Sequence, residues 1–386
     1  MGTYDFFLIP FLMDASMASG AIVLNLFAQD LGATPFQLGM LGFSWGLPYS
    51  VGAFLSGRLA DRLPRRLLLT FGLLLYSGVM FGYSFCGSVG QLIALGFLSG
   101  LGSSFFWPVF ETLLHEEDLG GTNRRMGAFN MGWTLGITTG SASGGYLMAL
   151  GPRTVFRVLG ILVLANLTYL LIRSSMGTRK VTETDTLPRD DPLPPLKERL
   201  KFLYVAWVAN FVMFFSRAAT TSMFPKVARV EGIPDGTIGL VLSLINVGQG
   251  LVFIVLSRTS SWHYKAAPIF VFEGVALAGM SLLGFGRNEP AYAAGMLLQG
   301  FGMGMAYSSS LFYALSATES KGASTGVHEM LVGSAFVSGP LLAGLVAQKV
   351  FLKAAFYLAS SAIFLGSLVQ LAVILLLREK LAEPEG

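Results

Sequence analysis

The sequence has little charge and almost no cysteine. Only 12% of its 386 residues are Asp, Glu, Lys or Arg, against about 25% in a typical soluble protein. Cys86 is the single cysteine, so an intramolecular disulfide and a cysteine-based metal or redox site are excluded. The sequence also lacks a Gly-x-x-x-x-Gly-Lys-Ser/Thr loop for ATP and any evident pairing of a nucleophile with a base. We therefore expect no enzyme activity, no cofactor and no bound metal.

The chain contains long apolar segments and few charged residues. Hydrophobic residues make up 53% of the chain, and its mean hydropathy is +0.64. Runs of about 20 residues recur, which is the length that a helix needs to cross ~30 Å of hydrocarbon. The sequence therefore predicts an all-α membrane protein with twelve transmembrane helices. The predicted spans are 4–27, 36–58, 67–86, 90–114, 125–149, 153–173, 202–225, 235–257, 266–285, 290–316, 324–348 and 353–377.

The basic residues between the spans orient the chain. With both termini on one side, that side carries eighteen Lys and Arg residues and the other side carries seven. Basic residues accumulate in cytoplasmic loops, so both termini are expected in the cytoplasm, in an inner or plasma membrane. The net charge of +4 lies in these loops and does not indicate a nucleic-acid partner. The first apolar run begins almost at Met1 and is long enough to span, so no cleavable signal peptide is expected.

The two halves of the chain repeat at an offset of 200 residues. Matching residues recur over most of each half, which predicts two pseudo-symmetric six-helix bundles. The matched pairs include Gly32 and Gly232, Gly39 and Gly239, Arg58 and Arg258, Arg65 and Lys265, and Trp107 and Tyr307. We expect an N-terminal bundle over 1–174 and a C-terminal bundle over 202–377. A proline-rich cytoplasmic linker over 175–201 and a tail over 378–386 complete the chain.

A charged motif follows the second span. The segment Gly57-Arg58-Leu59-Ala60-Asp61-Arg62-Leu63-Pro64-Arg65-Arg66 holds four arginines and one aspartate between two apolar runs. It resembles the signature loop of the major facilitator superfamily, Gly-x-Leu-Ala-Asp-Arg-x-Gly-Arg-Arg/Lys, and departs from it at Pro64. In that family the aspartate holds the second helix against the start of the eleventh in the outward-facing state. The resemblance implies conformational roles for Gly57, Asp61, Arg62 and Arg65, which would then not bind substrate.

Arg217 is the most unusual residue inside a predicted span. A guanidinium in the middle of the membrane needs water or a counter-charge, and Asp14 in the first span is the natural partner. Resemblance to the superfamily implies that the first and seventh helices face each other across a central cavity. The residues expected there to bind substrate or protons are Asp14, Asn25, Asn210, Arg217 and Thr221. The alternative is a buried ion pair between Asp14 and Arg217 that locks the two halves.

Other polar and aromatic side chains inside the spans are also candidates. Trp107 and Tyr307, at matching positions, are expected as aromatic walls of the cavity. Glu111 is expected as a gate residue or a titrating group, and a metal site formed with His115 is disfavoured by the solvated acids that follow. Residues in the early turns of the fifth and eleventh spans are expected at the cytoplasmic gate or the substrate site; they are Asn130, His328 and Glu329. No role is assigned to Glu273 in the ninth span.

The fifth span carries a stripe of small residues from Gly136 to Gly145, which permits close helix packing. The stripe also resembles a pattern of the drug–proton antiporter branch, with Ser141 in place of a proline. A second feature of that branch, an arginine in the fourth span, is absent, and Gly96 stands in its place.

The sequence thus predicts a monomeric secondary transporter that moves a small molecule by alternating access, as proton-coupled efflux of small organic compounds. Uptake or exchange of an organic anion or zwitterion bound by Arg217 is the alternative. A membrane sensor without net transport is a more remote one.

The predicted orientation can be tested with reporter fusions in a bacterial host. An alkaline phosphatase that is active only outside the cytoplasm should be active when fused after Gly151 and inactive when fused after Arg189. Activity in the reverse order would invert the topology.

Overall fold

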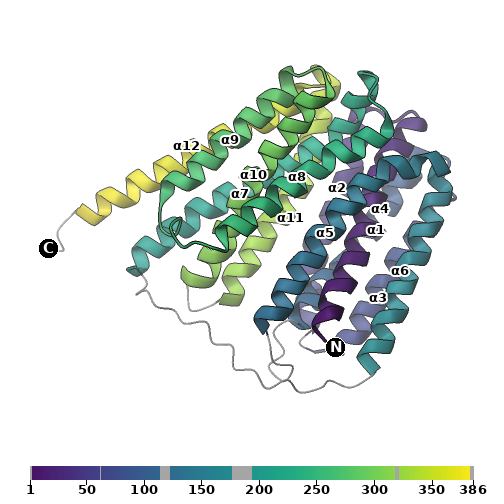
Figure 1. Cartoon of the computed structure of the whole chain (residues 1–386), viewed down its shortest axis with the longest axis horizontal. Helices are drawn as coiled ribbons and strands as arrows, with labels where there is room; N and C mark the ends of the chain where they lie inside the picture. The colour runs from purple at the N-terminus through teal and green to yellow at the C-terminus, as the bar shows by residue number, and fades with distance from the viewer. Residues whose placement is uncertain (1, 61, 114–121, 176–193, 318–320, 383–386) are drawn as a thin grey trace. The chain divides into compact units, whose positions relative to one another are not determined.

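The computed structural model is all-α, as predicted. It describes residues 2–60, 62–113, 122–175, 194–317 and 321–382, in which twelve α-helices follow one another (Figure 1). Asp61 and residues 176–193 of the predicted linker lie outside the described residues. The helices are α1 (Thr3–Asp30), α2 (Pro35–Ala60), α3 (Arg65–Tyr83), α4 (Val89–Thr112), α5 (Thr122–Leu147), α6 (Pro152–Ser175), α7 (Leu196–Val230), α8 (Asp235–Leu256), α9 (Ala266–Phe285), α10 (Glu289–Ala317), α11 (Lys321–Lys349) and α12 (Ala354–Ala382).

Ten of these helices are long and apolar enough to cross a membrane. The other two, α5 and α10, have 26 and 29 residues and are rich in glycine and serine, which lowers their hydropathy. The seventh helix is longer than its predicted span. It begins at Leu196, so residues 196–201 of the predicted linker are helical.

The chain divides into two compact units. Unit 1 comprises Met1–Asp190 together with Ala228–Ser243, and unit 2 comprises Asp191–Val227 together with Leu244–Gly386. The end of α7 and the start of α8 therefore pack in unit 1, and the remainder of both helices packs in unit 2. In unit 1, α1 packs against α5 and α6, while α4 packs against α2 and α3. In unit 2, α9 packs against α10 and α12, and α11 packs against the same two helices.

The small residues of α5 bring it into backbone contact with α1, and the two helices lie side by side in Figure 1. A Cβ added to Gly136 would meet the backbone oxygen of Phe11 at 2.6 Å, and one added to Gly140 would meet that of Ala15 at 2.5 Å. Only glycine fits at these two positions. The prediction that these small residues permit close helix packing is therefore confirmed.

The repeat is visible in the backbone where α1 and α7 end. Gly32 and Gly232 adopt φ angles of 81° and 79°, a region that glycine enters without strain. After each glycine the chain turns in the same way, with Ala33 N–H donating to Ala28 O and Ile233 N–H donating to Ala228 O, both at 2.9 Å. Two helix ends 200 residues apart thus share one terminating turn.

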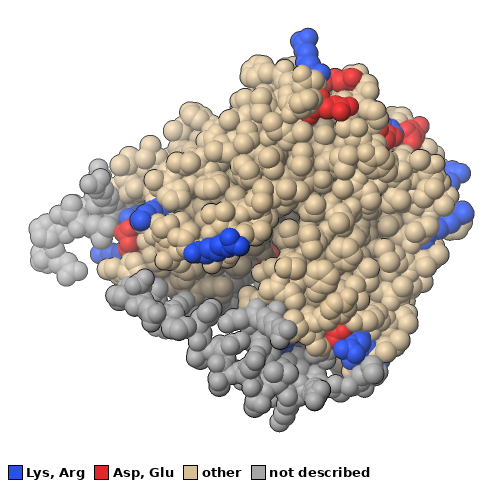
Figure 2. Space-filling view, viewed as in Figure 1, with Lys and Arg blue, Asp and Glu red and all other residues tan. Residues whose placement is uncertain are grey.

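Many large apolar side chains lie on the surface of the protein, as is expected where helices face lipid. Phe54, Phe364 and Leu376 are among the large side chains that are more than half exposed. In Figure 2 most of the drawn surface is tan, and most of the Lys, Arg, Asp and Glu side chains lie near its margins.

Substitution of one contact glycine should destabilise the protein. We expect Gly140→Ala to cost about 1–3 kcal/mol, because its Cβ overlaps the backbone of α1. Gly78→Ala in α3 is the matched control, since nothing lies within 4 Å of its added Cβ; it should be stabilising by about 0.5–1 kcal/mol. Melting temperatures of the purified variants in detergent measure both. Equal melting temperatures for the two variants would show that α1 and α5 do not pack this closely.

Candidate functional site

Arg217 lies inside unit 2 and is held by two amides of α8. It is 8% exposed, and it donates to Asn246 Oδ1 at 2.6 Å and to Gln249 Oε1 at 3.1 Å. Asn246 and Gln249 are three residues apart and so share one face of their helix. Both acceptors are neutral amide oxygens, and they orient the guanidinium. Thr221, one turn further along α7, donates to the backbone oxygen of Arg217 at 3.0 Å.

Aromatic rings lie next to Arg217 along the same face of α7. Phe214 is three residues before Arg217, and its ring centroid is 6.1 Å from that of Tyr307 and 5.9 Å from that of Phe336. Tyr307 also contacts Phe253 of α8, with ring centroids 5.7 Å apart. Four helices thus contribute to one aromatic layer. Tyr307 thus lies in an aromatic layer, and its predicted place in the wall of a substrate cavity stays a prediction.

A polar group lies on the other side of the rings. Asn210, one turn before Phe214, is completely buried, as is His328 of α11. His328 Nδ1 is 2.7 Å from Ser310 Oγ and 3.5 Å from Asn210 Nδ2, while its ring meets Tyr307 edge-on at 5.2 Å. Glu329 is 46% exposed, and its Oε1 is 3.8 Å from His328 Nε2.

We call these side chains the unit 2 cluster. Its members are Asn210, Phe214, Arg217, Asn246, Gln249, Phe253, Tyr307, Ser310, His328 and Phe336. The cluster contains three residues that the sequence placed at a substrate site, Asn210, Arg217 and Tyr307, together with His328, which the sequence placed at the cytoplasmic gate or the substrate site. Asn246 and Gln249 were not predicted, although two amides three residues apart in an apolar span are a signal that could have found them.

The residues predicted in the first half lie in unit 1. Asp14 is 5% exposed and faces α5, because a Cβ added to Gly136 would lie 3.0 Å from the Cβ of Asp14. Asn25, near the end of α1, accepts a hydrogen bond from Gln29 Nε2 at 2.9 Å. Since Asp14 and Arg217 belong to different units, their pairing stays a prediction.

The predicted aromatic and acidic residues of α4 are at its end. Trp107 is 7% exposed and contacts Phe106 and Phe129 edge-on, at ring centroid distances of 5.0 and 6.2 Å. Glu111 is half-buried in the last turn of the helix.

The residues predicted for gating are mostly at the surface. Arg62 and Asn130 are exposed, Arg65 is the half-buried first residue of α3, and nothing lies within 4 Å of a Cβ added to Gly57. Asp61 lies outside the described residues. Their conformational roles stay predictions.

Glu273, for which the sequence gave no role, has partners on a neighbouring helix. It is 2% exposed, and it accepts hydrogen bonds from Ser367 Oγ and Gln370 Nε2 of α12, each at 2.5 Å. A carboxylate inside the membrane is costly unless such donors meet it. These contacts tie α9 to α12.

A second buried carboxylate, Asp5, ties the start of α1 to the end of α6. It is completely buried and accepts from Tyr169 Oη at 2.7 Å and from Arg173 Nε at 2.8 Å. The backbone N–H of Gly2 also donates to it, at 2.6 Å. The sequence did not single out Asp5.

The loop equivalent to the charged motif has a different chemistry in unit 2. Ser261 stands at the position that corresponds to Asp61, and the residues after it are aromatic. His263 stacks on Phe312 with ring centroids 3.9 Å apart, and burial lowers the pKa of this imidazole. Tyr264 has a φ of 53°, and its N–H donates to Tyr313 Oη at 2.8 Å. An aromatic cluster thus holds this loop, where the first half has charges.

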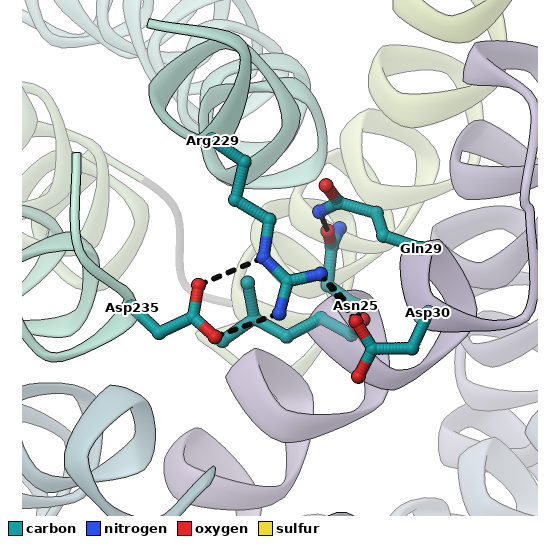
Figure 3. A network of polar contacts seen from close by, with 6 residues as sticks. Asn25, Gln29, Asp30, Arg229 and Asp235 are labelled. Atoms are coloured by element: carbon teal, nitrogen blue, oxygen red, sulfur yellow. Dashed lines mark hydrogen bonds and ion pairs between the residues drawn. The ribbon is translucent and has the colours of Figure 1, made fainter. Parts of the chain in front are cut away.

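Arg229 at the end of α7 joins three helix ends within unit 1 (Figure 3). It binds both carboxylate oxygens of Asp235 at 2.7 Å, and it donates to Asp30 Oδ1 at 2.8 Å and to Leu26 O at 3.0 Å. The positive guanidinium is stabilised by the two negative carboxylates and by the negative end of the helix dipole at the C-terminus of α1. The network connects the ends of α1 and α7 with the start of α8.

Long apolar helices in two units, with polar side chains held inside them, are the features of a membrane transporter. The chain belongs to the major facilitator superfamily, because the family model described as Major Facilitator Superfamily matches residues 6–335 and 206–385. Membership of this family indicates a transporter and not an enzyme.

Several characterised transporters are similar to it. The 4-hydroxybenzoate transporter PcaK of Pseudomonas aeruginosa is 30% identical over 178 residues, which are 45% of this chain and 39% of that protein. The inner membrane metabolite transport protein YgcS of Escherichia coli is 31% identical over 36% of this chain and 32% of its own length. The human glucose-6-phosphate exchanger SLC37A1 is 32% identical over 35% of this chain and 28% of its own. The similarity thus spans less than half of each relative.

Solved structures share the fold. A POT family transporter in complex with 5-aminolevulinic acid matches with a TM-score of 0.78 at 12% identity, covering 99% of this chain and 97% of that one. The nucleoside transporter NupG matches with a TM-score of 0.74 at 10% identity, covering 97% and 99%. At these identities the likeness concerns the fold alone.

The Arg229 network should show unequal couplings. Arg229 binds Asp235 through two hydrogen bonds and Asp30 through one, and Asp235 is 29% exposed where Asp30 is 46% exposed. Double-mutant cycles that measure the free energy of unfolding, with alanine at each position, should give a coupling energy of at most about 1 kcal/mol for each pair. The coupling of Arg229 to Asp235 should be larger than its coupling to Asp30. Both values should fall as salt is raised. A larger coupling to Asp30 would contradict this geometry.

Proposed function

We propose that the protein transports a small organic anion, and that Arg217 binds the anionic group. The observation that carries this proposal is a buried guanidinium oriented by the neutral oxygens of Asn246 and Gln249. Charge-assisted hydrogen bonds to a carboxylate or phosphate are strong and well directed for arginine, particularly where water is scarce. This favours the organic-anion alternative over general efflux.

Two kinds of relative support an anionic substrate. By their names, one group transports 4-hydroxybenzoate and another exchanges glucose-6-phosphate. Both compounds carry a negative group on a small polar or aromatic body. Because the similarity covers less than half of each relative, it supports the proposal and does not carry it alone.

Alternating access with an ion or substrate gradient as the energy source is part of the proposal. The two repeated halves are those of transporters that work in this way. We further propose a monomer in an inner or plasma membrane with both termini in the cytoplasm, an orientation that the eighteen-to-seven distribution of basic residues supports.

Proton-coupled efflux of organic compounds is the second candidate. The observation that favours it is Asp14, a buried carboxylate on α1 beside the glycine stripe of α5. A carboxylate inside a membrane helix is a natural proton-binding group. In this case Asp14, and not Arg217, would determine the charge of the substrate.

Flux assays in proteoliposomes test the proposal. The panel should contain aliphatic carboxylates, sugar phosphates, aromatic carboxylates and organic cations, with and without a proton gradient. We expect flux of at least one anion, and we expect Arg217→Gln to weaken its apparent affinity about thirtyfold or more, since loss of one partner of a buried charge pair costs about 2–5 kcal/mol. Arg258→Gln, which changes an exposed arginine of unit 2, is the matched control and should transport like the wild type.

Asp14→Asn separates the two candidates. Transport of a cation that is abolished by Asp14→Asn and unaffected by Arg217→Gln would overturn the anion proposal in favour of efflux. Absence of flux for every class would favour the sensor alternative.

A further inference from the structure

Residues 257–265 connect α8 with α9, and we call them the α8–α9 loop. The two helices that it joins are each long and apolar enough to cross a membrane. A segment this short stays close to the ends of its helices, so its side chains lie at the depth of the lipid headgroups. It contains two basic residues, Arg258 and Lys265, and no acidic one.

The two cations of this loop are open to their surroundings. Arg258 and Lys265 are both exposed, and no residue in the described part of the chain forms a hydrogen bond or an ion pair with either side chain. Lys201, near the start of α7, shows the contrast, because Glu198 binds it at 2.6 Å. The positive charges of the loop are therefore not neutralised by the described chain.

The repeat shows which group this loop has lost. Arg258 and Lys265 correspond to Arg58 and Arg65 of the first half, whereas Ser261 corresponds to Asp61. Both halves thus keep a basic residue at each of these two positions. In the second half, the carboxylate that would repel an anion is replaced by a hydroxyl group, which can donate a hydrogen bond to one.

Exposed hydroxyl groups lie in the turn between the two cations. Thr259, Ser260 and Ser261 are all exposed. Thr259 Oγ1 accepts from the backbone N–H of Ser261 at 3.1 Å and donates to Ser261 Oγ at 3.0 Å. The hydroxyl protons of Ser260 and Ser261 have no acceptor among the described residues, so they are available to the oxygens of a ligand.

Aromatic packing holds the loop in place. Trp262 is 7% exposed, and its ring centroid lies 5.2 Å from that of Phe312 of α10. His263 stacks on the same ring, and the N–H of Tyr264 donates to Tyr313 Oη. A surface that is already ordered loses little conformational entropy when a ligand binds. Tryptophan and tyrosine are also the residues that concentrate at the headgroup level of membranes.

Apolar side chains continue from the loop along the two helices. Ile254 and Val255, in the last turn of α8, are 51% and 59% exposed, and Val271, in the second turn of α9, is 61% exposed. A basic loop rich in hydroxyl groups next to an apolar surface matches a phospholipid, whose phosphate is joined to acyl chains. A soluble phosphate would use the loop alone.

We propose that the α8–α9 loop binds the headgroup of an anionic phospholipid. Arg258 and Lys265 attract its phosphate, because basic residues at the membrane surface favour anionic lipids. Ser260 and Ser261 donate hydrogen bonds to the headgroup, and the exposed apolar side chains at the end of α8 contact the acyl chains. A zwitterionic lipid carries a cation beside its phosphate and is therefore bound less well. The inference is independent of the transported substrate.

Photochemical labelling of the purified full chain tests this binding. The probe is a phosphatidylglycerol with a diazirine on its acyl chain close to the glycerol, present at low fraction in vesicles of phosphatidylcholine. Mass spectrometry locates the labelled peptides. Each basic residue near the surface is expected to contribute about fivefold, so labelling of residues 254–265 should be at least about tenfold stronger than with the corresponding phosphatidylcholine probe. Unlabelled phosphatidylglycerol should suppress it, and water-soluble glycerol 3-phosphate should not.

A matched pair of variants at Ser261 tests the role of charge. Ser261→Asp restores the acid of the first half and should reduce labelling by the phosphatidylglycerol probe about fivefold. Ser261→Asn changes the side chain to a similar size without the charge and should keep the labelling. Arg258→Gln combined with Lys265→Gln should reduce it about thirtyfold. Arg287→Gln, which removes an exposed arginine between α9 and α10, is the control and should leave labelling of the α8–α9 loop unchanged. Melting temperatures verify that every variant is folded.

Three results would contradict the inference. Equal labelling of the loop by the two probes would show lipid contact without selection. Suppression by glycerol 3-phosphate would indicate a site for a soluble phosphate in place of a lipid. Equal labelling of Ser261→Asp and Ser261→Asn would show that charge does not determine binding. None of these results bears on the proposed function, which concerns Arg217 and is tested by flux.

Discussion

Hydrocarbon offers no hydrogen-bond partner, and this constraint governs every polar side chain inside the helices. Glu273 accepts hydrogen bonds from Ser367 and Gln370 of α12. Asp5 accepts hydrogen bonds from Tyr169 and Arg173 of α6. In each case a carboxylate on one helix finds donors on another, and the pairing holds the two helices together. The same constraint gives the unit 2 cluster its significance, because some of its polar atoms find no such partner in the described chain.

The choice of partner decides what a buried charge can do. A carboxylate next to a guanidinium removes most of its electrostatic attraction for other anions, whereas an amide oxygen fixes its direction and leaves its charge. Arg229 illustrates the first case, with Asp30 and Asp235 beside it at a helix end (Figure 3). Arg217, on the same helix, donates to the amide oxygens of Asn246 and Gln249.

The repeat provides one scaffold for two chemistries. Gly32 and Gly232 end the first helix of each half with the same turn. The side chains at equivalent positions nevertheless differ: Gly46 and Tyr49 correspond to Asn246 and Gln249, and Met17 corresponds to Arg217. Backbone turns and close helix contacts are required in both halves by geometry, while the polar residues are free to diverge. The anion-binding chemistry that we propose belongs to the second half alone.

The sequence by itself determined the class, the helices and the repeat, because apolar runs of spanning length, glycine at the helix ends and the motif around Arg62 are local patterns. It also identified Arg217, since a charge inside an apolar run is visible without a structure. Only the tertiary structure decided which side chains form the unit 2 cluster. Asn246, His328 and Phe336 come from helices far apart in the chain, and their meeting depends on packing, which leaves no periodic signal. The partners of Glu273, almost 100 residues away, were invisible for the same reason.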